Sequence, residues 1–139
     1  MSSIIIINEP PSSSKTWNAL RIAAALLGND EQLEVFFMND GVFNILENQK
    51  PPKEIEGQAT CSKIKDLVNI GAKVFYCSQC VETRGITEAQ IASVVEKSNL
   101  IELAKSSHSI RDLLIEWANL SVTVAASSKV ILRALQSSL

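Results

Sequence analysis

Short apolar runs alternate along the chain with segments in which apolar residues recur every three or four positions. The runs are typical of strands buried on both faces of a parallel sheet. They cover residues 4–7, 33–38, 73–76, 100–103 and 122–125. The periodic segments have the spacing of amphipathic helices. We expect helices at residues 14–27, 60–69, 88–95 and 109–118 and a short one ending at Leu46. Residues 129–136 also have helical spacing, but they could instead continue the last strand.

The alternation of strands and helices predicts an α/β fold. Its sheet should be mostly parallel and five-stranded, with helices on both faces. A chain of 139 residues is long enough for one domain with its own core. Because the sequence contains no internal repeat and no low-complexity block, we treat residues 1–139 as a single domain.

The number and distribution of charged residues argue against some classes of binding partner. The net charge is −2 and the sequence pI is about 5.4. Lysines and arginines are scattered, which argues against a nucleic-acid partner and against a polybasic membrane patch. The N-terminal apolar run ends at Asn8 without a preceding basic region, and no run is long enough to span a membrane. We therefore expect a cytoplasmic protein with reduced thiols.

The segment VFYCSQCVETRG, residues 74–85, carries the clearest candidate chemistry. Cys77 ends the third predicted strand, and reactive groups collect at the carboxyl ends of strands in open parallel sheets. Arg84 could fold back and favour the thiolate, which is the nucleophilic form of the thiol. Gly85 would allow a tight turn with positive φ. Asp40, in the turn after the second strand, could face the same edge, although capping of the next helix would also explain it.

Four interpretations of the cysteines compete. Cys-x-x-Cys is half of a zinc site, but the sequence shows no matching second half. A thioredoxin-like dithiol normally opens a long helix, and Gly85 leaves little room for one. Cys80 could simply be a small buried apolar residue. A persulfide carrier needs one exposed, activated cysteine and a docking surface, and it needs neither a metal nor a cofactor.

Three segments resemble the DsrE/DsrF/TusD family of small sulfur-relay proteins. They are VFYCSQCVETRGI at residues 74–86, FFMNDGVFNIL at residues 36–46 and DLLIEW at residues 112–117. The resemblance implies a three-layer α/β/α, Rossmann-like domain that assembles into trimers or hexamers. It also implies that the sulfur-carrying cysteine is Cys77 and that Cys80 stands where some relatives have a second cysteine. Many relatives have no assigned reaction.

The leading hypothesis is a sulfur-trafficking protein that carries persulfide sulfur on Cys77 and passes it to a partner thiol. Cys77 and Arg84 are the candidate catalytic residues, and Cys80, Asp40 and Gly85 are candidate binding residues. The partners would be a sulfur donor, an acceptor and further copies of the chain. One alternative is an oligomeric scaffold of the same fold without chemistry, and another is a redox sensor that closes Cys77 onto Cys80.

An apolar cluster around the second strand supports the expected homo-oligomer. A small domain buries only part of such a cluster, and an exposed remainder would mark an interface. The cluster consists of Phe36, Phe37, Phe43, Ile45 and Leu46.

Overall fold

The computed structural model describes residues 2–107, 112–117 and 120–125 of the chain. The strands are β1 (Ser2–Ile7), β2 (Gln32–Phe37), β3 (Lys73–Cys77), β4 (Glu96–Ser98), β5 (Asp112–Trp117) and β6 (Leu120–Ala125). The α-helices are α1 (Ser14–Gly28), α2 (Thr60–Asn69), α3 (Ser78–Thr83) and α4 (Leu100–Ser107). Short 3-10 helices form η1 (Asn39–Ile45), η2 (Lys53–Gln58) and η3 (Glu88–Gln90).

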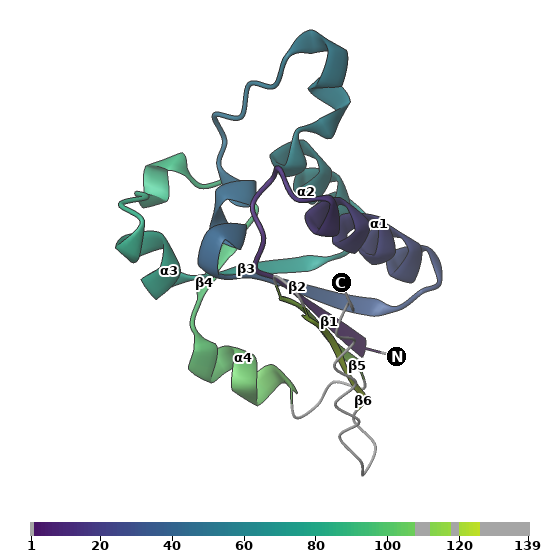
Figure 1. Ribbon diagram of the computed structural model, residues 1–139. Coiled ribbons are helices and arrows are strands. Elements are labelled where there is room, and N and C mark those ends of the chain that lie inside the picture. The colour runs from purple at the N-terminus through teal and green to yellow at the C-terminus, as the bar shows by residue number, and fades with distance from the viewer. Residues whose placement is uncertain (1, 108–111, 118–119, 126–139) are drawn as a thin grey trace.

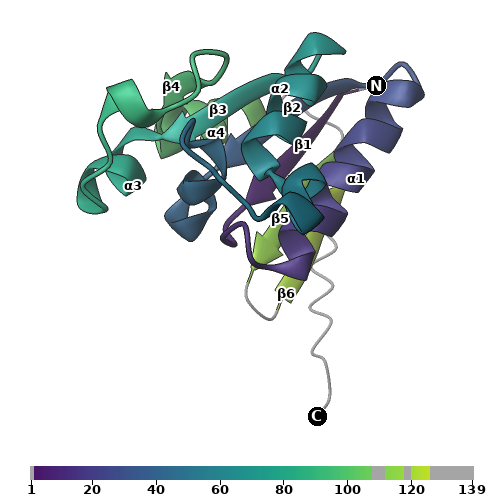
Figure 2. The same ribbon diagram turned by 90° about the horizontal axis from the view of Figure 1, so that it is seen from above.

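The strands form one sheet in the order β4-β3-β2-β1-β5-β6, and only the β5–β6 pair is antiparallel. From β1 to β3 the chain moves steadily toward one edge, so right-handed crossovers place α1 and α2 on the same face. The connection from β4 to β5 runs in the opposite direction and places α4 on the other face (Figure 1). The fold is therefore the expected three-layer α/β/α arrangement around a mostly parallel sheet. Figure 2 shows α1 and α2 lying over the sheet from above.

Alternate side chains of the central strands enter two separate apolar layers. Ile5, Val35 and Tyr76 belong to the larger layer, which packs against α1 and α2. Ile4 and Phe36 belong to the smaller layer on the α4 side. Burial on both faces explains why these strands read as continuous apolar runs rather than as alternating patterns.

Residues 100–103, which we expected to be a strand, form the first turn of α4 instead. The side chain of Asn99 begins this helix, because its Oδ1 atom accepts the N–H groups of Ile101 and Glu102 at 2.9 and 3.0 Å. The edge strand β4 lies just before it and is charged and polar in sequence. Such a strand lacks the apolar run on which the prediction relied.

Two of the predicted helices are also wrong. Residues 112–117, placed in a helix at 109–118, form β5 and pair with β1 and β6, while residues 109–111 and 118 lie outside the described part. In the segment 88–95, only Glu88–Gln90 is helical, because the chain then joins an isolated bridge between Leu46 and Ile91. The expected strand at 122–125 is confirmed within β6. The described residues form six strands rather than five, because β4 and β5 take the place of the one strand expected at 100–103. Residues 129–136 lie outside the described part.

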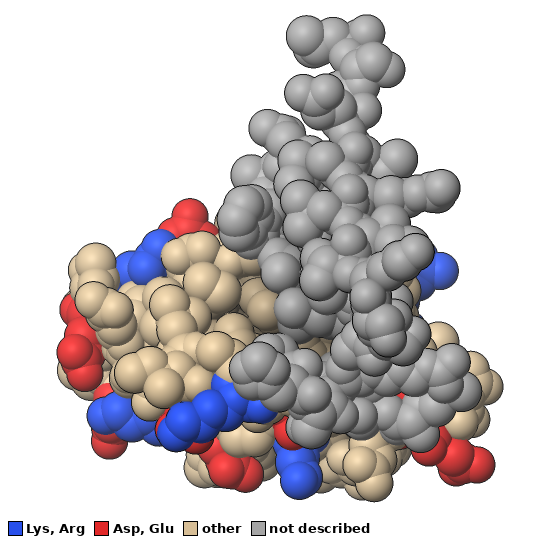
Figure 3. All heavy atoms as spheres, turned by 90° about the horizontal axis from the view of Figure 1, so that it is seen from below, with Lys and Arg blue, Asp and Glu red and all other residues tan. Residues whose placement is uncertain are grey.

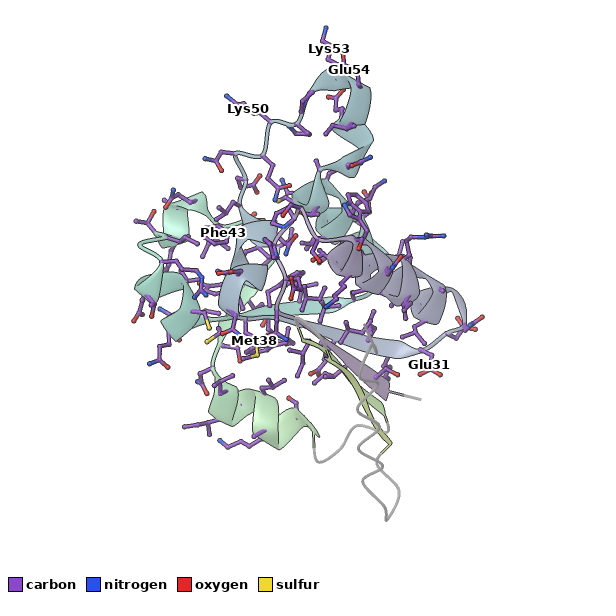
Figure 4. The ribbon with its side chains drawn as sticks, in the orientation of Figure 1. Glu31, Met38, Phe43, Lys50, Lys53 and Glu54 are labelled. Carbon is purple, nitrogen blue, oxygen red and sulfur yellow. The ribbon has the colours of Figure 1, made fainter. Side chains whose placement is uncertain are left out.

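The apolar cluster around β2 is mostly core. Phe36, Phe37 and Ile45 are buried, whereas Phe43 is 36% exposed. Only part of the cluster is buried, as expected, and Phe43 is its exposed remainder; the interface that this remainder would mark stays a prediction. The exposed segment 47–58 stands away from the body, with Lys50, Lys53 and Glu54 near its tip (Figure 4).

None of the helices in the described part of the chain combines the length and the apolar character that crossing a bilayer requires.

The η1 helix packs tightly against the end of β1 and so fixes the loop beside the sheet edge. A Cβ atom on Gly41 would overlap the carbonyl oxygen of Ile7. The buried side chain of Asn44 donates to the carbonyls of Glu9 and Gly41, both at 2.9 Å. Because backbone lies against backbone here, the position has no flexible neighbour that could make room for a side chain.

We predict that Gly41→Ala lowers the free energy of unfolding by about 2–3 kcal/mol, because the added methyl group forces backbone to move. Gly28→Ala is the matched control, since a Cβ atom there meets nothing within 4 Å. It should change stability by no more than about 0.5 kcal/mol. Urea unfolding of both variants measures the difference. Equal stabilities would contradict the close contact at Gly41.

Candidate functional site

Cys77 stands at the junction between β3 and α3. It is the last residue of β3, where it pairs with Ser98 of β4, and it is also the N-cap of α3. Its backbone is still extended, with φ −74° and ψ 113°. The prediction that this thiol lies at the carboxyl end of the third strand is confirmed.

The side chain of Cys77 is buried, with an exposed fraction of only 2%. It packs in the smaller apolar layer with Ile6 and Phe36, beside the partly buried Met38 and Leu103. Met38 lies between the sheet and α4 in Figure 4. The expectation of an exposed thiol is therefore wrong in this conformation, because the side chain points to the face that α4 covers.

Cys80 lies one helical turn after Cys77 and is partly exposed. Its backbone N–H group donates to the Sγ atom of Cys77 at 3.4 Å. Burial raises the pKa of the Cys77 thiol, and a hydrogen bond with the Cys80 side chain raises it further. The backbone N–H groups of Cys80 and Gln79 act in the opposite direction but do not reverse the shift. At neutral pH, Cys77 in this conformation is a protonated thiol.

Arg84 fixes the position of α3 rather than contacting the Cys77 sulfur. Its Nε and Nη2 atoms donate to Oδ1 of Asp40 at 3.0 and 2.9 Å. Its Nη1 atom donates to the carbonyl of Cys80 at 3.1 Å. The guanidinium group thus ties the turn that carries Cys80 to η1, and the predicted approach of Arg84 to the Cys77 thiol is not what the geometry shows.

Gly85 ends α3 in a tight turn. Its φ is +65°, as predicted from the Arg-Gly pair. Its N–H group donates to the carbonyl of Glu82 at 3.0 Å, and the N–H group of Ile86 returns to Val81 at 3.1 Å. The structure therefore brings Cys77, Cys80, Arg84 and Asp40 together through a chain of hydrogen bonds, with Gly85 closing the segment.

Met38 and Leu103 were not predicted as part of the site, although both pack in the layer that holds Cys77. Met38 could have been found, because it directly follows Phe37, which pairs with Tyr76 in the parallel register. Parallel neighbours end at the same edge of a sheet, so Met38 must lie next to Cys77. Leu103 could not have been predicted as a neighbour of Cys77, because residues 100–103 were expected to form a strand and not the helix α4 that covers the thiol.

The third cysteine does not join the other two. Cys61 is buried in the larger apolar layer, on the α1 and α2 side of the sheet, and burial raises its pKa. Among the described residues, no three histidine, cysteine or acidic side chains are grouped so that they could hold a metal ion. The described chain therefore supplies a pair of thiols and no set of metal ligands.

A cleft of 440 Å³ lies at the opposite edge of the sheet from the thiols. Residues that begin β1, β2 and β3 line it, among them Ser3, Gln32 and Lys73. Glu31, which also lines this cleft, is at the far end of the sheet from Met38 in Figure 4. The thiol pair is therefore not at the base of this cleft.

The chain is similar in sequence and fold to several known proteins. The crystal structure of the ychN protein from E. coli matches with a TM-score of 0.76 and 30% sequence identity, covering 84% of this chain and 99% of that one. An uncharacterized protein of Methanopyrus kandleri is 28% identical over 103 residues, which are 72% of this chain and 80% of its own length. A TusC homolog of Aliivibrio fischeri is 31% identical over 80 residues, 57% of this chain and 67% of its own length.

The sequence profile of one family covers most of the chain. It is described as the DsrE/DsrF-like family, and it matches residues 1–116, a range that includes Asp40, both thiols of the site, Arg84 and Gly85. Together with the α/β/α fold shared with the ychN protein, this match shows that the chain belongs to the DsrE/DsrF-like family.

Proposed function

We propose that the protein is a sulfur-trafficking protein that carries persulfide sulfur on Cys77 and passes it to a partner thiol. The observation that carries the proposal is a pair of cysteines at the carboxyl end of β3, one buried and one partly exposed, in which the backbone N–H group of Cys80 donates to the Sγ atom of Cys77. Membership of the DsrE/DsrF-like family and the similarity to a TusC homolog support a role in sulfur relay. The chemistry needs only the thiols of this chain and of its partners.

The transfer is a thiol–persulfide exchange. A thiolate of the protein attacks the terminal sulfur of a donor persulfide, so that a new S–S bond forms while the donor's S–S bond breaks. The donor leaves as a thiolate and takes up a proton. Burial of Cys77 would then shield the carried sulfur from reductants until an acceptor docks.

The assembly we propose is a homo-oligomer, trimeric or hexameric, in the cytoplasm, where thiols stay reduced. Its support is the exposed apolar start of α4, where Leu100 is 47% and Ile101 is 69% exposed. Figure 3 views the α4 side and shows uncharged surface bordered by charged side chains. Apolar surface of this kind favours contact with another protein chain.

A second candidate function is a redox sensor that closes a disulfide between Cys77 and Cys80. The short separation of the two cysteines favours it, since the backbone N–H group of Cys80 donates to the Sγ atom of Cys77 at 3.4 Å. Counting the S–H groups of the protein before and after treatment separates the two functions. A sensor loses two S–H groups together on mild oxidation, because a disulfide forms. A sulfur carrier loaded by persulfide keeps each S–H group, either as a thiol or as a persulfide.

We predict that incubation with inorganic polysulfide adds one sulfur atom to Cys77, located by mass spectrometry of the peptide that contains it. In Cys77→Ser, the sulfur that survives a brief wash with reductant should fall by about tenfold or more, because no buried thiol holds it. Cys61→Ala is the matched control and should keep the adduct, since Cys61 lies on the other side of the sheet. An unmodified Cys77 in wild type would refute the proposed carrier.

Alkylation of Cys77 should depend on pH in the direction set by its raised pKa. An unperturbed cysteine titrates near pKa ~8.5. Because the raised pKa keeps Cys77 protonated to higher pH, its alkylation rate should still be rising where that of a short cysteine peptide has levelled off. Iodoacetamide labelling from neutral to alkaline pH measures this. A Cys77 rate that levels off below neutral pH would contradict the buried, protonated thiol.

We further predict that Arg84→Ala exposes Cys77 more often. Removing the guanidinium group breaks its bonds to Asp40 and to the carbonyl of Cys80, so α3 opens more readily. Alkylation of Cys77 at fixed pH should speed up by about threefold to tenfold. Arg21→Ala removes the same charge from an exposed position on α1 and should leave the rate unchanged. Equal rates in the two variants would show that Arg84 does not hold the segment closed.

A further inference from the structure

We propose that Cys80 is the thiol that receives sulfur from outside, and that Cys77 obtains its sulfur only by transfer from Cys80. This inference rests on the proposed function and deepens it, because it divides the work between the two thiols. Cys80 faces the donor, and Cys77 stores the sulfur.

The difference in exposure carries the first part of the argument. A donor protein must bring its persulfide into contact with the attacking sulfur, and Cys77 exposes only 2% of its surface. Cys80 is partly exposed and packs at the border of both apolar layers. A donor can therefore reach Cys80 in the conformation described, whereas it reaches Cys77 only after α3 or α4 has moved.

The contact between the thiols carries the second part. The N–H group of Cys80 donates to Sγ of Cys77 at 3.4 Å. Both side chains also pack in the smaller apolar layer. A sulfur atom held on Cys80 therefore lies next to the Cys77 thiol without any change in the sheet. Arg84 supports this placement, since it binds the carbonyl of Cys80 at 3.1 Å and anchors the same turn to Asp40.

The internal step balances within the chain. The sulfur of Cys77 attacks the terminal sulfur of the Cys80 persulfide, so that one S–S bond forms at Cys77 as the S–S bond at Cys80 breaks. Cys80 departs as a thiolate and takes the proton that Cys77 gives up. Cys77 attacks as the thiolate, so it loses its proton before the new S–S bond forms. No oxidant or reductant is needed.

Time-resolved loading with inorganic polysulfide tests the division of roles, with the sulfur located on each cysteine by mass spectrometry. In wild type, the Cys80 adduct should form first and the Cys77 adduct should grow as it decays. In Cys77→Ser, Cys80 should load at the wild-type initial rate and keep its sulfur until a reductant removes it. In Cys80→Ser, loading of Cys77 should slow by about tenfold or more, because local opening must come first.

The outcomes separate this inference from the proposed function. Loading of Cys77 at the wild-type rate in Cys80→Ser would overturn the role of Cys80 and leave Cys77 as a carrier. Failure of both cysteines to load in wild type would overturn the proposed function itself. Formation of a Cys77–Cys80 disulfide with release of hydrosulfide would overturn the storage step, because Cys77 would then attack the inner sulfur. Urea unfolding of Cys80→Ser, compared with wild type, identifies any loss of loading that comes from a destabilised fold.

Discussion

The side-chain alternation of β3 decides which environment the thiol of Cys77 meets. Val74 and Tyr76 enter the layer beneath α1 and α2, so Phe75 and Cys77 must point to the opposite face. On that face α4 covers the sheet, and the thiol becomes part of an apolar layer instead of an open edge. A shift of β3 by one residue would send the sulfur to the other face, so the sheet register decides that the thiol packs beneath α4 rather than beneath α1 and α2.

The ion pair between Arg84 and Asp40 matters to the site because it positions α3, and it contributes little to the free energy of unfolding. Asp40 has a side chain that is 59% exposed, and exposed pairs contribute little to stability. The pair nevertheless links two segments that follow neighbouring strands, since η1 follows β2 and α3 follows β3. A weak link of this kind holds α3 in place while leaving its opening energetically accessible. Such a balance suits the proposed carrier, in which the buried sulfur would be loaded and unloaded.

The part of the site that lies on one strand and its following turn could be predicted from the sequence. The apolar run from Val74 to Tyr76 places Cys77 at a strand end, and the Arg84-Gly85 pair predicts the turn with positive φ. Burial of the thiol could not be predicted, because it depends on α4. The four apolar or helix-compatible residues from Leu100 to Leu103 fit a short strand as well as a helical turn, and length alone does not separate the two.

The same ambiguity explains the error at DLLIEW, residues 112–117. Apolar residues in this hexamer suit one side of a helix, but the segment pairs along its whole length with β1 or β6. Whether residues 112–117 form a helix or a strand depends on pairing with β1, which lies more than a hundred residues earlier in the chain. A pattern within the hexamer itself carries no information about this pairing. The number of possible strand orders could have been reduced from the sequence in one way. The first strand, β1, is apolar on both faces and central, so it needs a neighbouring strand on each side.

The apolar layer beneath α4 borders an open space. A cleft of 260 Å³ lies between the sheet and α4, lined in part by Ile4, Phe36 and Leu103. These three side chains also pack in the layer that contains Cys77. A well-packed core resists the addition of even one heavy atom, because neighbouring side chains must leave their preferred rotamers. A layer with room beside it can instead absorb an added atom by small side-chain movements, so in the proposed carrier α4 would stay closed over a sulfur held on Cys77.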